Sequence, residues 1–169
     1  GKIIDIKETV DKIFNADRDK RVQAVNYKIT PYLTETDLNS IVAEISSYQT
    51  IITGTKNRRD NIKLAVDLIN NTLVTAGEVF SFNKAVGPRS KDRGFKESIQ
   101  IVEGELRSGI GGGICQVSST LYNAVNLKNL EVIELHHHSQ KVGYVPEGKD
   151  ATVAWRYLDF KFKNKFATP

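Results

Sequence analysis

The chain has 169 residues, of which 24 are Lys or Arg and 20 are Asp or Glu, so its formal net charge is +4. At this length a chain forms one domain, or one domain and part of another. Its single cysteine, Cys115, excludes an internal disulfide. There is no run of about 18 apolar residues that would predict a membrane span, and no basic stripe interleaved with aromatic residues that would indicate a nucleic-acid partner.

The chain begins at Gly1, contains no methionine and shows no signal-peptide pattern. We therefore expect it to be the soluble part of a longer protein, with any contact to a membrane made only through an anchor outside it. The modest positive charge suits an acidic partner such as an anionic cell-wall polymer.

Residues 1–45 predict a small α/β segment. Val10, Ile13 and Phe14 are spaced for one face of a helix. Residues 22–29 are rich in β-branched side chains and favour a strand. The expected order is strand, helix, strand and a short helix that ends at residue 45.

A longer helix is predicted from about residue 59 to residue 70, with Asn57 as its N-cap. Two short strands are expected beyond it, at 72–74 and 79–82. The helix prediction depends on apolar side chains that recur along one face, namely Ile62, Ala65, Val66, Ile69 and Leu73.

The second half of the chain predicts a hairpin, a helix and then mainly strands. The hairpin turns around Gly104, and a helix begins after the glycines at 111–113 and ends near Asn129. The strands that follow are expected at 131–135, 141–145, 151–157 and 160–162. We therefore expect an α+β fold, in which the helix that carries Cys115 packs on a mainly antiparallel sheet formed mostly by residues 131–164.

Cys115 is the first candidate for chemistry because it follows three consecutive glycines at the start of a predicted helix. A helix N-terminus stabilises negative charge and can lower a cysteine pKa from about 8.5 to roughly 3.5–7.5. Consecutive glycines also permit positive φ angles or the close approach of another group, such as a substrate carbonyl. The alternative is a buried structural cysteine on an apolar helix face.

A nucleophilic cysteine needs a base, and a further group must orient that base. The histidines of the chain are consecutive, His136, His137 and His138. On a strand, the first and third would face one side and the second the other. Asp150 and Asp159 are the acids available to hold an imidazole. A solvated strand end or a metal site are competing interpretations of the cluster, although a single cysteine argues against structural zinc.

Ordered motifs extend from about residue 46 to residue 164. They are Arg59-x-Asn61-Ile62, Gly77-Glu78-x-Phe80-Ser81-Phe82-Asn83, Gly87-Pro88-Arg89, Arg93-Gly94-Phe95, the run from Gly111 to Ala124, His138-Ser139, Tyr144-Val145-Pro146-x-Gly148-x-Asp150-Ala151 and Asp159-Phe160-x-Phe162-x-Asn164. Together they resemble the VanW family of bacterial cell-envelope proteins. Residues 1–45 are similar to the end of the peptidoglycan-binding module that often precedes this domain.

The resemblance implies a VanW catalytic domain at 46–169 and an extracytoplasmic location, in the cell wall or anchored in the membrane and facing the wall. It implies an L,D-transpeptidase that joins two diaminopimelate residues of peptidoglycan stem peptides through a cysteine acyl-enzyme, with no cofactor and no metal. Cys115 would be the nucleophile and His138, in the family's His-Ser step, the base.

Asp150 is expected to orient His138, with Asp159 as the second choice. The expected substrate-binding residues are Gly112, Gly113, Gln116, Arg59 and Tyr144. Backbone amides around the glycines would hold an oxyanion, and a guanidinium fork suits a stem carboxylate. Each side chain also has a structural alternative: Gln116 as a helix-surface amide, Arg59 as a helix-start residue beside Asp60, and Tyr144 as a core aromatic.

Two rival functions remain open from the sequence. The same cysteine and histidine could hydrolyse a stem peptide, as in a carboxypeptidase or endopeptidase, because transfer and hydrolysis differ only in whether an amine or water attacks the thioester. The glycine-rich loop could also cradle a ligand in a non-catalytic wall-binding module.

Overall fold

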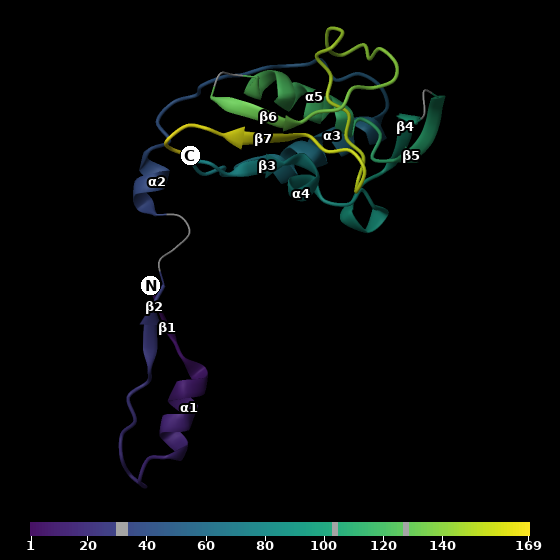
Figure 1. The fold of residues 1–169 in the computed structure, drawn as a ribbon. Helices are drawn as coiled ribbons and strands as arrows, with labels where there is room; N and C mark the ends of the chain where they lie inside the picture. Colours follow the sequence, from purple (N-terminus) through teal and green to yellow (C-terminus); the bar gives the residue numbers. More distant parts are fainter. Residues whose placement is uncertain (30–33, 103–104, 127–128) are drawn as a thin grey trace. The chain divides into compact units, whose positions relative to one another are not determined.

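The structure is a computed structural model that describes residues 1–29, 34–102, 105–126 and 129–169. Two compact units make up the chain, Gly1–Asn39 and Ser40–Pro169, and each is described by itself (Figure 1).

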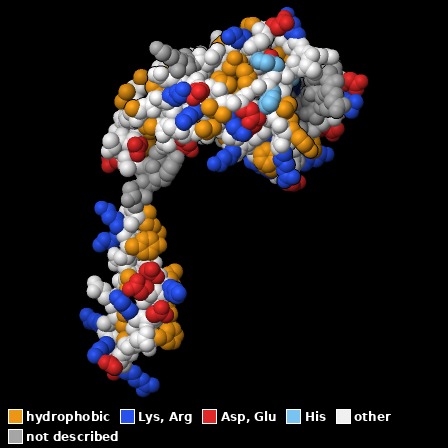
Figure 2. Space-filling view, viewed as in Figure 1, with side chains coloured by type: hydrophobic (Ala, Val, Ile, Leu, Met, Phe, Trp, Pro, Cys, Tyr) orange, Lys and Arg blue, Asp and Glu red, His pale blue; other side chains and the backbone are white. Residues whose placement is uncertain are grey.

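The first unit is a strand pair with a helix between the two strands. β1 (Lys2–Ile4) pairs antiparallel with β2 (Asn26–Lys28), and α1 (Ile6–Phe14) lies between them in the sequence. Asp5 caps α1 by accepting a hydrogen bond from the amide of Glu8 at 2.9 Å. None of the α1 side chains is buried, and hydrophobic side chains appear on the surface of this unit (Figure 2).

The short helix α2 (Glu35–Asn39) completes the predicted order of elements. The sequence prediction extended this helix to residue 45, which is wrong. Ile41, Val42 and Ile45 are all exposed, and a short helix without a buried apolar face gains too little to persist in water.

The second unit is built on a three-stranded antiparallel sheet with the strand order β3-β7-β6. The strands are β3 (Val79–Ser81), β6 (Leu130–Glu134) and β7 (Lys161–Asn164). Phe80 lies opposite Phe162 in the register, and their rings stack with centroids 4.9 Å apart. This cross-strand aromatic pair anchors the core under the sheet.

Two helices pack with this sheet around one hydrophobic core. α3 (Lys56–Ile69) buries Ile62 and Ala65, and α5 (Ile114–Val125) contributes Tyr122, whose ring meets Phe160 edge-on at 5.7 Å. The two helices also contact each other. The expected α+β architecture, with the Cys115 helix on an antiparallel sheet, is therefore confirmed (Figure 1).

The N-cap of α3 is Thr55, whose hydroxyl accepts from the amide of Arg58 at 3.3 Å. The prediction of Asn57 as the cap is wrong. The Asn57 side-chain amide instead donates to the carbonyl of Glu97 at 3.0 Å, so it links the helix to the hairpin. The helix consequently begins earlier than the apolar stripe alone indicated.

The hairpin is confirmed, with β4 (Glu97–Val102) antiparallel to β5 (Glu105–Ile110). Its turn at Gly104 lies outside the described residues. Pairing continues past β5, because the amide of Gly111 donates to the carbonyl of Lys96 at 3.0 Å. The hairpin thus delivers the chain directly into the glycine turn that precedes α5.

Of the two strands predicted between α3 and β4, the one at 72–74 is wrong and the one at 79–82 is confirmed as β3, which ends one residue earlier. Residues 72–74 form no strand, because the carbonyl of Val74 accepts from the side chain of Asn164 instead of a strand amide. β3 ends at Ser81 because its hydroxyl caps the helix α4 (Phe82–Val86) by accepting from the amide of Lys84. A short 3₁₀ helix, Lys91–Arg93, follows.

In the C-terminal region, the strands predicted at 131–135 and 160–162 are confirmed as β6 and β7, whereas those at 141–145 and 151–157 are wrong. Val142 and Val145 are buried by packing within a loop, and Ala151 is hydrogen-bonded to a helix side chain. A single isolated bridge joins Ala154 to Leu158. α5 ends at Val125 with Asn126 as its C-cap, before the predicted end near Asn129, and residues 127–128 lie outside the described residues.

Candidate active site

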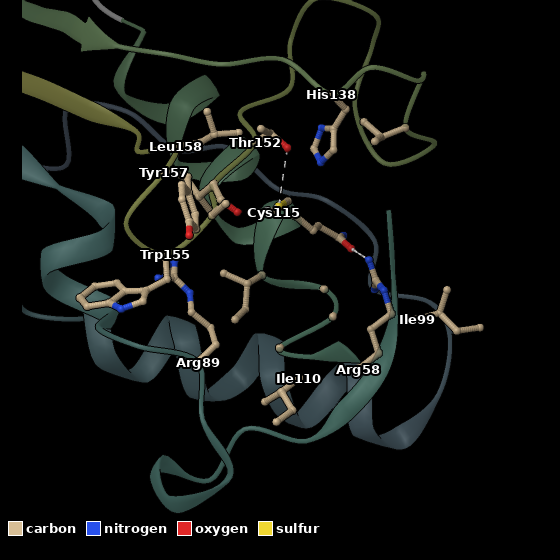
Figure 3. Close-up of a pocket in the computed structure, with 18 of the residues that line it drawn as sticks. Arg58, Arg89, Ile99, Ile110, Cys115, His138, Thr152, Trp155, Tyr157 and Leu158 are labelled. Atoms are coloured by element: carbon tan, nitrogen blue, oxygen red, sulfur yellow. Dashed lines mark hydrogen bonds between the residues drawn. The ribbon is translucent and has the colours of Figure 1, made fainter. Parts of the chain in front are cut away.

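A cavity of about 960 Å³ opens at the N-terminal end of α5 (Figure 3). Its walls come from the glycine turn, the first turn of α5, Arg58 of α3, and the loops that carry His138 and Thr152. Cys115 lies in this wall, so the cysteine and the cavity form one site within the second unit.

The glycine turn sets the position of Cys115. Gly113 is the N-cap of α5 and has a φ of 106°, in the left-handed region that favours glycine. At Gly112, a Cβ atom would lie 2.5 Å from the carbonyl oxygen of Ile99. The turn is therefore pressed against β4, and only glycine fits at that contact.

Asn61 fixes the same turn by hydrogen bonds from α3. Its side chain is fully buried on α3 and donates to the carbonyls of Gly112 at 3.1 Å and Lys96 at 2.9 Å, while its oxygen accepts from the amide of Lys96 at 2.7 Å. The sequence reasoning assigned Asn61 no role. A buried amide is the usual way to satisfy polar backbone groups in a turn.

The thiol of Cys115 is held by several polar partners. Its Sγ donates to the carbonyl of Val153 at 3.6 Å and accepts from the hydroxyl of Thr152 at 3.9 Å. Burial raises the pKa of this thiol, but hydrogen bonding and charge interaction with His138 outweigh burial, and the net pKa lies below the ordinary value. The environment therefore favours the thiolate, the nucleophilic form of cysteine.

His138 lies between Cys115 and Asp150. Its Nδ1 is 2.7 Å from Oδ2 of Asp150, and its backbone amide donates to the same oxygen at 2.7 Å. With Nδ1 engaged, the other ring nitrogen, Nε2, is left for the thiol, and Figure 3 shows the imidazole directed toward Cys115. Burial lowers the pKa of His138, but the interactions with Cys115 and then Asp150 prevail and raise it.

Asp150 completes the row as a carboxylate. Burial raises its pKa, yet the hydrogen bonds from the amide and ring of His138, and from His137, bring it below the ordinary value. His137 approaches the second carboxylate oxygen with its Nδ1 at 3.1 Å. The strand prediction that placed His137 away from His138 is wrong, because β6 ends at Glu134 and both rings reach one acid.

The arrangement can do nucleophilic acyl chemistry. Cys115 is a nucleophile whose thiolate form is favoured by His138, and the carboxylate of Asp150 fixes the orientation of the imidazole. Of the two acids considered from the sequence, Asp150 contacts the imidazole and Asp159 does not. Asp159 accepts from the hydroxyl of Ser81 at 2.5 Å and the amide of Asn83 at 2.8 Å, so it holds the start of α4.

Helix α5 also positions the acid. The Ser119 hydroxyl accepts from the amide of Ala151 at 2.9 Å, and the Ser118 hydroxyl donates to the carbonyl of Ala151 at 2.6 Å. Both serines are fully buried. Sequence reasoning missed this pair, although two hydroxyl residues on the buried face, three and four positions after Cys115, are a signal for such a clamp.

Gln116 and Arg58 brace one side of the cavity. The buried Gln116 side chain accepts from Arg58 Nη2 at 2.7 Å and donates to the carbonyl of Ile51 at 3.0 Å. Arg59, the arginine expected to bind substrate, is exposed, lies outside the cavity and donates to the carbonyl of Gly54. The cavity is lined by its neighbour Arg58 instead.

Tyr144, Gly112 and Gly113 all line the cavity, as expected of substrate-binding candidates. Burial raises the pKa of Tyr144 far above its usual value, and the nearby charge of Cys115 adds to the shift. Its phenol therefore stays protonated at neutral pH. His136 lies outside the cavity wall, with its Nε2 3.0 Å from Glu134.

Residues 57–169 match the family described as VanW like protein. The chain belongs to the VanW family. Two curated relatives are similar to it. This VanW chain is 48% identical over 114 residues to the uncharacterized protein YoaR of Bacillus subtilis, which is 68% of the chain and 38% of the relative. It is 31% identical over 148 residues to the vancomycin B-type resistance protein VanW of Enterococcus faecalis, which is 84% of the chain and 53% of the relative.

The chain thus spans about 38% and 53% of the lengths of these two relatives. No solved structure matches it significantly. Within the described part of this VanW chain, no helix is both long and apolar enough to span a membrane. The same residues contain no cluster of three or more His, Cys, Asp or Glu side chains that could hold a metal ion.

Proposed function

We propose that this VanW domain is a peptidoglycan L,D-transpeptidase that forms 3-3 cross-links, between two diaminopimelate residues, through a cysteine acyl-enzyme. The observation that carries the proposal is the row Cys115, His138 and Asp150 at the wall of a cavity of about 960 Å³. One relative is named as a vancomycin resistance protein, and this name supports a role for the chain in the cell wall. Stem peptides lie outside the cytoplasm, and the protein would act there.

In the first step the Cys115 thiolate attacks the carbonyl carbon of diaminopimelate in a donor tetrapeptide. A carbon–sulfur bond forms, and the amide bond to the terminal D-alanine breaks. The imidazolium of His138 gives its Nε2 proton to the departing amine. The products are a thioester, free D-alanine and a neutral imidazole, which Asp150 keeps in the orientation with Nε2 toward the sulfur.

In the second step the side-chain amine of a second stem attacks the thioester. His138 accepts the proton from this amine, and the sulfur departs as the thiolate. The starting ion pair is restored. Because one amide bond is exchanged for another, neither step needs a redox cofactor.

The developing oxyanion requires a donor at the helix start. The amides of Ile114 and Gln116 already donate to the carbonyls of Gly111 and Gly113. The amide of Cys115 has no partner among the described residues and is the donor we assign to the oxyanion. Loss of such a donor lowers rates on the order of 100- to 1000-fold.

The experiment is product analysis by mass spectrometry after incubation with a disaccharide-tetrapeptide. Transpeptidation is supported if the wild type produces dimers and free alanine and Cys115→Ala produces neither. Shortened monomers alone would assign a hydrolase, and cellular function retained by Cys115→Ala would assign a binding module. His138→Ala should also abolish product, whereas His136→Ala, a matched loss of an imidazole outside the cavity, should not.

A further inference from the structure

Arg89 presents an unusual donor to the cavity. Its Nη1 donates to the carbonyl of Gly87 at 2.9 Å. Its Nη2 is buried and has no hydrogen-bond partner among the described residues. The side chain lines the same cavity as Cys115, so the wall of that cavity holds a cationic donor with unused hydrogen-bonding capacity.

The surroundings pack the guanidinium without giving its Nη2 a hydrogen-bond acceptor. Its central carbon lies 5.9 Å from the ring centroids of both Phe82 and Trp155, and a Cβ at Gly111 would lie 3.0 Å from Arg89 Cγ. Burial lowers the pKa of Arg89 to about 10, while the charges of Cys115 and Asp159 act in the opposite direction, so it remains charged at neutral pH. Among the described residues, Asp159 forms its salt bridge with Lys161 and not with Arg89. A buried charge without a hydrogen-bonded anion is costly.

Arg58, on the other side of Cys115 in Figure 3, differs in this respect. Its Nη1 donates to the carbonyl of Thr53 at 2.9 Å and its Nη2 to Gln116 at 2.7 Å. Arg58 is therefore committed to bracing the wall. Arg89 has the free donor.

We infer that Arg89 binds a carboxylate of the peptide whose carbonyl Cys115 attacks, and thereby selects acidic stem peptides over amidated ones. The inference rests on the proposed function for the identity of the peptide. An anion there would fill the unused Nη2 donor with a charge-assisted hydrogen bond. A tetrapeptide donor offers two such groups near the attacked carbonyl: the terminal carboxylate of the departing alanine and the free carboxylate of diaminopimelate.

The test measures kcat/KM with three donors: the free acid, the peptide amidated at its terminus, and the peptide amidated on diaminopimelate. Arg89→Gln should lower kcat/KM for the free acid roughly 10- to 100-fold, the loss typical of a hydrogen bond to a charged group. The donor amidated at the recognised carboxylate should be equally poor with wild type, and Arg89→Gln should weaken it no further. The amidated donor that shows this pattern identifies the carboxylate that Arg89 recognises.

Two controls accompany these measurements. Arg107→Gln removes the same charge from β5, where Arg107 pairs with Glu105, and should leave kcat/KM unchanged. Arg89→Lys keeps the charge and much of the stem, and should lose less activity than Arg89→Gln. If Arg89→Gln is less stable than the wild type, the activity of Arg89→Lys still tests the inference.

A readout without turnover separates the two ideas. Cys115→Ala is titrated calorimetrically with the same peptides, alone and combined with Arg89→Gln. Equal turnover of all donors by wild type and Arg89→Gln would overturn the inference and leave the proposed function standing. Absence of product with every donor would overturn the proposed function, whereas carboxylate-dependent binding that is lost with Arg89→Gln would still support the inference.

Discussion

The substitution Asp150→Asn tests most directly the electrostatic coupling of Cys115, His138 and Asp150. The change keeps the size of the side chain but removes the negative charge that faces the imidazole of His138 at 2.7 Å. In the wild type, His138 lowers the pKa of Cys115, and Cys115 and Asp150 raise the pKa of His138, so both shifts favour the thiolate–imidazolium pair. Without the carboxylate, the imidazolium is less stable, so the pKa of His138 should fall and that of Cys115 should rise.

The size of the effect follows from the contact. A hydrogen bond to a charged group contributes about 1.5–3 kcal/mol, and one pKa unit corresponds to about 1.36 kcal/mol. Asparagine still offers a neutral oxygen, so the lower end applies. We expect this loss to lower the pKa of His138. The pKa of Cys115 should rise by a smaller amount, because it feels Asp150 only through the imidazole.

The assay is the rate of alkylation by iodoacetamide as a function of pH, which reports the thiolate fraction of the only cysteine in the chain. Asp159→Asn is the matched control. Both acids are 8% exposed, but Asp159 accepts from the Asn83 amide at the start of α4 and forms no hydrogen bond with His138. Asp159→Asn should lower the melting temperature and leave the alkylation midpoint in place. The same midpoint in Asp150→Asn and the wild type would refute the reasoning.

Three further predictions concern stability. Gly112→Ala places a methyl group 2.5 Å from the carbonyl of Ile99 and should cost about 1–3 kcal/mol in urea unfolding, with an unchanged value arguing against the close approach. Asn61→Ala leaves the amide of Lys96 and the carbonyl of Gly112 without their side-chain partner. It should cost about 2–4 kcal/mol, well above the cost of Asn57→Ala at an exposed position. Glu134 has its pKa lowered to about 2, so its stabilisation is present above its ordinary value of 4.5 and is lost as pH falls toward 2. The melting temperature of Glu134→Gln should accordingly lie below wild type at neutral pH and converge with it in acid.

The glycine turn and the helix with Cys115 could be predicted because their signals are local. Three glycines cannot continue a helix or strand cheaply, and the apolar period after them is helical. Asp150 was preferred to Asp159 as the partner of His138, but local sequence signals do not separate the two acids, because both lie in the same tail. Their partners depend on how loops close over long sequence distances, and no spacing rule encodes this.

The sequence also carries a signal that Arg58, and not Arg59, lines the cavity. Arg58 lies four residues before Ile62 and seven before Ala65, the spacing of one helix face, and both of those residues are buried. Arg59 lies off this face. Because the prediction placed the N-cap at Asn57, the predicted helix started too late, and Arg58 was not counted on the apolar face. The loops predicted as strands failed for a different reason, since their apolar residues are buried without a strand partner.

The serine pair on α5 has a consequence for when the thiol becomes reactive. Ser118 and Ser119 hold Ala151, so the residue that precedes it, Asp150, docks only when α5 is formed. An emerging or damaged chain in which this docking fails carries an ordinary cysteine with a resting thiol. The contacts that lower the pKa of the Cys115 thiol are thereby coupled to completion of the fold.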